Sequence, residues 1–121
     1  MIAAKRHRPV RLAAAAEADI EEILCWTTER FGERQTGIYA ETLAAPLEEL
    51  SEGLEASGAR ERSDIARGLL TLHVARRGRK GRHFVMFRIG RDSQTEVIEV
   101  LRVLHDAMDL PRHLPPEGEG T

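Results

Sequence analysis

The fold is decided by the stretch His83-Phe-Val-Met-Phe-Arg-Ile-Gly-Arg-Asp-Ser-Gln-Thr-Glu-Val-Ile-Glu-Val-Leu-Arg-Val-Leu104. Residues 83–89 alternate between two faces, and residues 97–104 are rich in β-branched side chains, so both segments are predicted to be strands. The connection between them contains glycine and is short enough for a hairpin. Residues 69–76 also alternate with a period of two and lead into a short connection. The second half of the chain is therefore predicted to be a run of antiparallel strands.

The first half has the spacing of helices. A group of acids marks the start of the first helix, where carboxylates face the positive end of the helix dipole, and Gly32 marks its end. Its inward stripe is predicted to be Ile20, Ile23, Leu24, Thr27 and Phe31. The second helix is expected over residues 33–55, with an apolar stripe of Tyr39, Leu43, Leu47, Leu50 and Leu54. Pro46 lies inside it and predicts a kink or a break.

These elements come in the order β-α-α-β-β-β, because residues 9–14 read as a short edge strand and residues 56–68 as a connecting loop. Helices grouped early and strands grouped late indicate an α+β fold, with a helical hairpin packed on a mainly antiparallel sheet. We expect a single domain over residues 1–114 and a disordered tail over residues 115–121.

Composition excludes several classes of protein. The chain has 121 residues, 41% of them hydrophobic, a net charge of −2 and one cysteine. A single cysteine forms no internal disulfide, and no apolar run is long enough to cross a bilayer, so we expect a cytoplasmic protein. No cofactor-binding motif is present. Cys25 has no neighbouring base in the sequence, and we expect it to be a buried or half-buried small residue.

Two groups of residues could carry function. The basic loop contains Arg76, Arg77, Arg79, Lys80 and Arg82, and it could be a solvated hairpin, a contact for an acidic protein surface or a nucleic-acid contact. The net negative charge disfavours DNA binding. His105, Asp109 and His113 do not have the spacing of a zinc motif, so a structural role is expected.

Several segments together resemble a known family. They are Ala18-Asp-Ile-Glu-Glu-Ile-Leu24 with Arg30-Phe-Gly32, the stripe that begins at Tyr39, Gly81-Arg-His-Phe-Val-Met-Phe-Arg88, and Ile98-Glu-Val-Leu-Arg-Val-Leu-His-Asp-Ala-Met-Asp-Leu-Pro-Arg-His-Leu114. In these the chain resembles ParE toxins of type II toxin–antitoxin modules, within the RelE/ParE superfamily. The resemblance spans residues 9–114 and agrees with the predicted topology.

The resemblance implies a toxin that binds DNA gyrase and blocks replication without catalysing a reaction, and a ParD-like antitoxin that neutralises it. It suggests candidate target-binding residues near the C-terminus: Arg102, His105, Met108, Asp109, Arg112 and His113. The helical stripe from Tyr39 to Leu54 is the candidate antitoxin-binding surface. Two alternatives stay open: a RelE-like ribosome-dependent mRNA endonuclease, for which the C-terminal region lacks a tyrosine, and an inactive relative that serves as a binding partner.

Overall fold

The computed structural model describes residues 8–53 and 58–107. The elements are β1 (Val10–Leu12), α1 (Ala14–Phe31), α2 (Glu33–Glu52), β2 (Arg60–Glu61), β3 (Leu70–His73), β4 (His83–Asp92) and β5 (Thr95–His105). Five residues that the sequence singled out, namely Leu54, Met108, Asp109, Arg112 and His113, lie outside the described residues, as does the tail 115–121.

The sheet has the strand order β1-β5-β4-β3-β2. β1 pairs in parallel with β5, and the other neighbours are antiparallel, so the predicted α+β fold with an edge strand near residue 10 is confirmed. The prediction for residues 56–68 was incomplete, because Arg60 and Glu61 form β2 on the far edge, opposite Thr71 and Leu70. Two exposed charged residues carry no alternating pattern from which a strand could be predicted.

The two faces of the sheet carry separate apolar clusters. The helices cover one face, where Leu43 and Leu50 of α2 pack with strand residues such as Val85, Phe87 and Val100. The opposite face holds a smaller cluster around Leu69, Met86 and Leu104, covered in part by Ile65 and Ala66. The long pair β4–β5 therefore has apolar side chains on both faces, as its alternation predicted.

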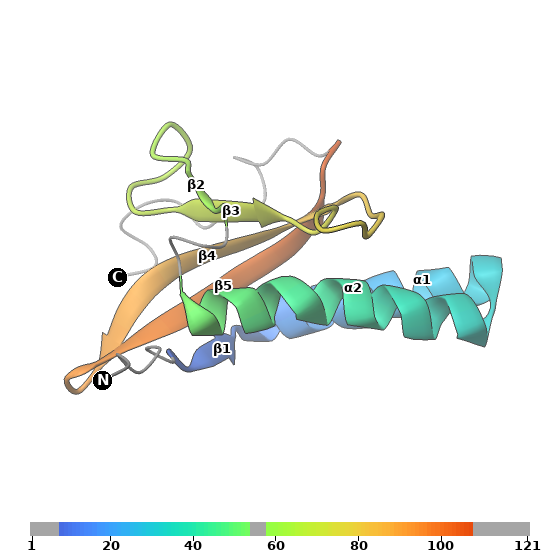
Figure 1. Cartoon of the computed structure of the whole chain (residues 1–121), viewed down its shortest axis with the longest axis horizontal. Coiled ribbons are helices and arrows are strands. Elements are labelled where there is room, and N and C mark those ends of the chain that lie inside the picture. Colours follow the sequence, from blue (N-terminus) through green and yellow to red (C-terminus); the bar gives the residue numbers. More distant parts are fainter. Residues whose placement is uncertain (1–7, 54–57, 108–121) are drawn as a thin grey trace.

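The helical hairpin extends past the end of the sheet. Figure 1 shows α1 and α2 side by side, with their connected end projecting beyond the strands. Gly32 joins the helices with φ of 87°, a left-handed conformation that glycine adopts without strain. Because this end has no sheet beneath it, Phe31 is 63% exposed, and the prediction that it faces inward was wrong. Cys25 is also exposed, contrary to expectation.

The helix α2 is not broken at Pro46. It runs without interruption from Glu33 to Glu52, and the pyrrolidine ring is fully buried. A proline inside a helix removes one backbone hydrogen bond, and burial of its ring offsets part of that cost. The predicted break is therefore absent.

Candidate functional site

A groove of about 980 Å³ opens where the helical hairpin leaves the sheet. Its walls are α1, the start of α2, the loop between β3 and β4, and the last residues of β5. The lining combines apolar, acidic and basic side chains with two imidazoles, among them Ile23, Trp26, Phe31, Asp19, Glu22, Arg79, Lys80, Arg82, His83 and His105. A space of this size lies at the upper end of the range for ligand sites.

The apolar wall of the groove is exposed to solvent. Trp26 is 51% exposed and Phe31 is 63% exposed, and their rings meet edge to face with centroids 5.8 Å apart. The guanidinium of Arg30 lies 5.3 Å from the centroid of the Trp26 ring. Aromatic and arginine side chains are enriched at protein interfaces, and clustered exposed apolar surface commonly marks one.

The base of the groove is tied to α1 by Asp19. Its carboxylate accepts hydrogen bonds from Arg102 Nε at 2.7 Å, from Arg102 Nη2 at 2.8 Å and from the backbone N–H of Val103 at 2.9 Å. Asp19 is only 8% exposed, so these contacts are shielded from water. The hydrogen bond to Asp19 raises the pKa of the Arg102 guanidinium. One buried carboxylate thus fixes α1 against the end of β5.

A second tie holds the basic loop against α2. The backbone N–H of Arg82 donates to the hydroxyl oxygen of Tyr39 at 3.2 Å, and the same oxygen lies 2.6 Å from His83 Nδ1. Gly81 permits this approach, because a Cβ there would lie 2.6 Å from Val74 Cγ2 and 2.8 Å from the Tyr39 hydroxyl. Burial raises the pKa of Tyr39, which keeps the phenol protonated.

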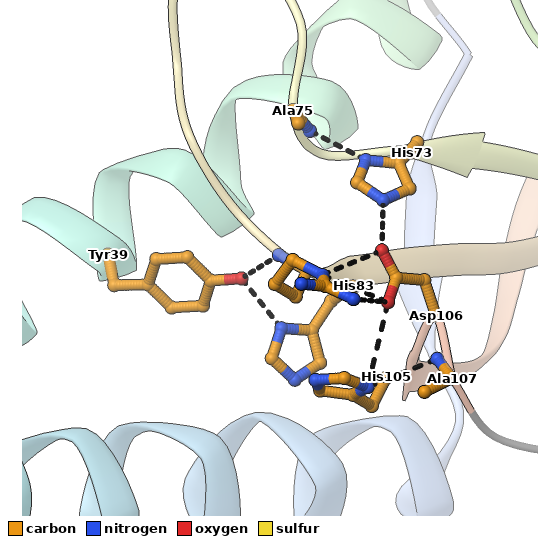
Figure 2. A network of polar contacts seen from close by, with 8 residues as sticks. Tyr39, His73, Ala75, His83, His105, Asp106 and Ala107 are labelled. Carbon is orange, nitrogen blue, oxygen red and sulfur yellow. Dashed lines mark hydrogen bonds and ion pairs between the residues drawn. The ribbon is translucent and has the colours of Figure 1, made fainter.

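Three histidines gather at one end of the sheet, as Figure 2 shows. His83 and His105 are cross-strand partners on β4 and β5, and their rings meet edge to face with centroids 5.4 Å apart. His73 Nε2 lies 3.0 Å from a carboxylate oxygen of Asp106. Asp106 also accepts from Arg82 Nε at 3.1 Å. The cluster joins the ends of β3, β4 and β5 through side chains.

The polar cluster shifts the titration of its members. Burial lowers the pKa of His83 to about 4, and repulsion from His105 adds to the effect. The hydrogen bond from His73 lowers the pKa of Asp106, and Arg82 lowers it further. His83 is therefore neutral and Asp106 ionised at neutral pH.

The basic loop divides into paired and unpaired cations. Arg76 and Arg77 both contact Glu49, each with one nitrogen 2.9 Å from Oε1. Arg82 pairs with Asp106 as described. Arg79 and Lys80 are exposed at the rim of the groove, and neither forms an ion pair with a described residue. Both side chains are therefore available to an acidic partner.

The groove brings together some of the residues singled out in the sequence and not others. Arg102, His105 and Tyr39 line it with Arg79, Lys80 and Arg82. Leu43 and Leu50 are 4% and 0% exposed within the core, and Leu47 packs against the same cluster. Leu43, Leu47 and Leu50 of the predicted stripe therefore face the sheet.

Sequence reasoning did not identify Asp19, Trp26 and His83 as groove residues. Asp19 is one of several acids near the start of the first helix, with Glu17, Glu21 and Glu22, and nothing in the sequence distinguishes it from them. A signal did exist for Trp26, which lies outside the predicted inward stripe of α1 and is therefore expected at the surface.

The described residues, 8–53 and 58–107, hold neither a cluster of metal ligands nor a helix that could span a membrane. That part of the chain contains no group of three or more histidine, cysteine or carboxylate side chains arranged to hold a metal ion. Within the same ranges, neither helix has the length and hydropathy needed to cross a bilayer.

Comparison with known proteins gives two matches. The model of the family described as "ParE toxin of type II toxin-antitoxin system, parDE" matches residues 10–110. Toxin ParE1 of Caulobacter vibrioides is 30% identical over 107 residues, which cover 88% of this chain and 98% of that protein.

Proposed function

Because the chain belongs to the ParE toxin family of type II toxin–antitoxin systems, we propose that it is a cytoplasmic toxin that acts by binding another protein. The target implied by the resemblance to ParE toxins is DNA gyrase, whose inhibition blocks replication. A ParD-like antitoxin neutralises the toxin by covering the surface that the target needs. No bond is made or broken by the toxin in this mechanism.

The observation that supports a binding mechanism is the groove with its exposed aromatic wall. Trp26 and Phe31 expose half or more of their surface and face a space large enough to receive several side chains of a partner. Covering them with a partner removes apolar area from water, at about 25 cal/mol per Å². Arg79 and Lys80 also line the groove and form no ion pair with a described residue, so they add electrostatic attraction for an acidic partner.

The test combines cells and purified components. Induction of the chain without antitoxin is expected to produce filamentous bacteria with arrested replication, and purified toxin is expected to inhibit DNA supercoiling by gyrase. Addition of the antitoxin from the same module should restore supercoiling. Normal growth would instead indicate an inactive relative, and full gyrase activity at saturating toxin would exclude gyrase as the target.

A second candidate function is metal-free RNA cleavage, favoured by one observation. Tyr39, His83, His105 and Arg82 meet at one end of an open groove, and neutral His83 could accept a proton. Against it, Glu22 lines the same groove and repels phosphate. In addition, Nδ1 of His105 already accepts a hydrogen bond from the backbone N–H of Ala107 at 3.1 Å, so that nitrogen is engaged.

A translating extract separates the two candidates. Cleavage of messenger RNA by the purified chain, lost in His105→Ala and in His83→Ala while both variants stay folded, would establish the nuclease. Intact messenger RNA with inhibited gyrase is the result expected from the binding mechanism.

A further inference from the structure

We propose that the open edge of β4, residues 88–92, pairs antiparallel with the same edge of a second copy of this chain, so that the two sheets become one. The inference goes beyond the proposed function and is independent of it. The edge lies at the end of β4 that is away from the groove, because the groove is lined by His83 at the start of that strand. Pairing of two copies therefore leaves both grooves accessible.

The strand β4 continues beyond its neighbour β3. The pairing of these two strands ends at Phe87, because the chain turns at Leu69, whose N–H donates to the carbonyl oxygen of Ala66. On its other side β4 stays paired with β5 as far as Asp92. Figure 1 shows the hairpin of β4 and β5 running on past β3. Residues 88–92 thus have a strand neighbour on the β5 side alone among the described residues.

The backbone of this edge has donors and acceptors that point outward. Val74 donates to the carbonyl oxygen of His83, which makes these two residues a hydrogen-bonded pair. Such pairs alternate along an antiparallel ladder, so every second residue after His83 directs its N–H and C=O toward the β3 side. Beyond the end of β3 these residues are Ile89 and Arg91. On that side neither backbone bonds to a described residue, and such a row is a template for another strand.

The sequence of the edge is complementary to itself in the antiparallel direction. When Gly90 lies opposite Gly90 of the second copy, Ile89 and Arg91 face each other as hydrogen-bonded pairs, and all the outward backbone groups are satisfied. The same register places Arg88 opposite Asp92 at both ends of the pairing. Opposite charges directly across two strands stabilise their pairing. An identical edge is therefore a partner that fits both the backbone and the charges.

The side chains already present leave room for this pairing. Arg88 Nε lies 2.8 Å from Glu99 Oε1, and Asp92 contacts Arg11. Each of these four side chains is between 37% and 56% exposed, so a second ion pair can form without breaking the first. A Cβ at Gly90 would lie 2.8 Å from the Glu99 carboxylate, so glycine at this position gives that carboxylate its place above the strand. The joined edges would contain equal numbers of acids and bases.

Arg91 is the residue on this edge that would oppose pairing, since a charged side chain on an edge strand commonly prevents it. In the proposed register Arg91 lies opposite Ile89 of the second copy. Ile89 is half-buried and packs against the core cluster beneath the helices. The methylene groups of Arg91 can cover this side chain while the guanidinium stays in water.

Sedimentation of the full-length chain, free of antitoxin, tests the association. Five paired residues form a small contact beside the roughly 1,600 Å² of a standard interface, so we expect a weak dimer that forms at about 100 µM and dissociates on dilution. Arg91→Pro removes one outward donor and should weaken the dimer at least tenfold. The matched control Arg91→Ala keeps the N–H and should stay within about threefold. Circular dichroism confirms that both variants fold. A chain that stays monomeric at 100 µM, or equal association of the two variants, would overturn the proposal.

Disulfide trapping tests the register. Arg88→Cys and Asp92→Cys are made as separate chains in a Cys25→Ser background, because Cys25 is exposed. Oxidation of their mixture at about 100 µM should cross-link them, since facing residues of a non-hydrogen-bonded pair have Cα atoms about 4.5 Å apart. Either chain alone should cross-link at least tenfold less, because like positions lie about 13 Å apart along the strands. Equal cross-linking by a single chain and by the mixture, or none in the mixture, would refute this register.

Discussion

Replacing Asp19 with alanine is expected to destabilise the fold, because this buried carboxylate holds α1 against the end of β5. The substitution removes three hydrogen bonds at once and leaves the Val103 N–H without its acceptor inside the protein. It also removes the Asp19 carboxylate from the guanidinium of Arg102, whose side chain is 26% exposed. Breaking a buried ion pair costs about 3–5 kcal/mol, and partial exposure of Arg102 reduces the expected loss to about 2–4 kcal/mol.

Urea unfolding of the refolded, antitoxin-free chain measures this loss. The midpoint should fall with an unchanged dependence on denaturant, since the surface exposed on unfolding stays the same. Asp19→Asn keeps an acceptor for Val103 and should lose about half as much stability as Asp19→Ala. A loss below about 1 kcal/mol for Asp19→Ala, or equal losses for the two variants, would refute the role given to this carboxylate.

Three further predictions concern the groove. Gly81→Ala should destabilise the chain by about 1–3 kcal/mol in the same assay, because the added methyl would lie 2.6 Å from Val74 Cγ2. An unchanged urea midpoint would mean that the loop accommodates the methyl group without loss of stability. The pKa of His83 is lowered from 6.5 to about 4, so the unfolded chain binds more protons in that window. The free energy of unfolding should accordingly fall as the pH is lowered from about 6.5 to about 4. His83→Gln should reduce this pH dependence in acid unfolding curves, and an unchanged pH dependence would exclude His83 as its source. Trp26→Ala and Phe31→Ala, at exposed positions, should change the unfolding free energy by less than about 1 kcal/mol and yet weaken antitoxin binding at least tenfold. Unchanged affinity in calorimetry would show that these rings lie outside the interface.

Most of the fold could be predicted from the sequence because its signals are local. The alternation in residues 83–89 and 97–104 follows from the pleat of a strand. The position of Gly32 follows from the backbone conformation at the end of a helix. Both β4 and β5 were found where the pattern indicated, although β4 continues to Asp92 and β5 begins at Thr95. The ends of strands that turn through a polar hairpin carry no apolar pattern.

The groove could not be predicted, since it depends on where the helices end relative to the sheet. Phe31 continues the apolar spacing of α1, and the sequence does not show that the sheet has ended beneath it. Tyr39 shares a stripe with buried leucines, yet its hydroxyl reaches across to His83 and the backbone of Arg82. These are contacts between residues more than 40 positions apart in the chain, and no local spacing encodes them.

Trp26 is the sole tryptophan of the chain and lies in the wall of the groove, so acrylamide quenching of its fluorescence tests the central claim most directly. Any tryptophan of the antitoxin is first replaced by a non-fluorescent residue, so that Trp26 alone emits. The bound toxin should then show a blue-shifted spectrum and a quenching constant several times smaller than that of free toxin. A neutralised complex in which Trp26 is quenched as readily as in the free chain would contradict the account, because the antitoxin would then act through a different surface.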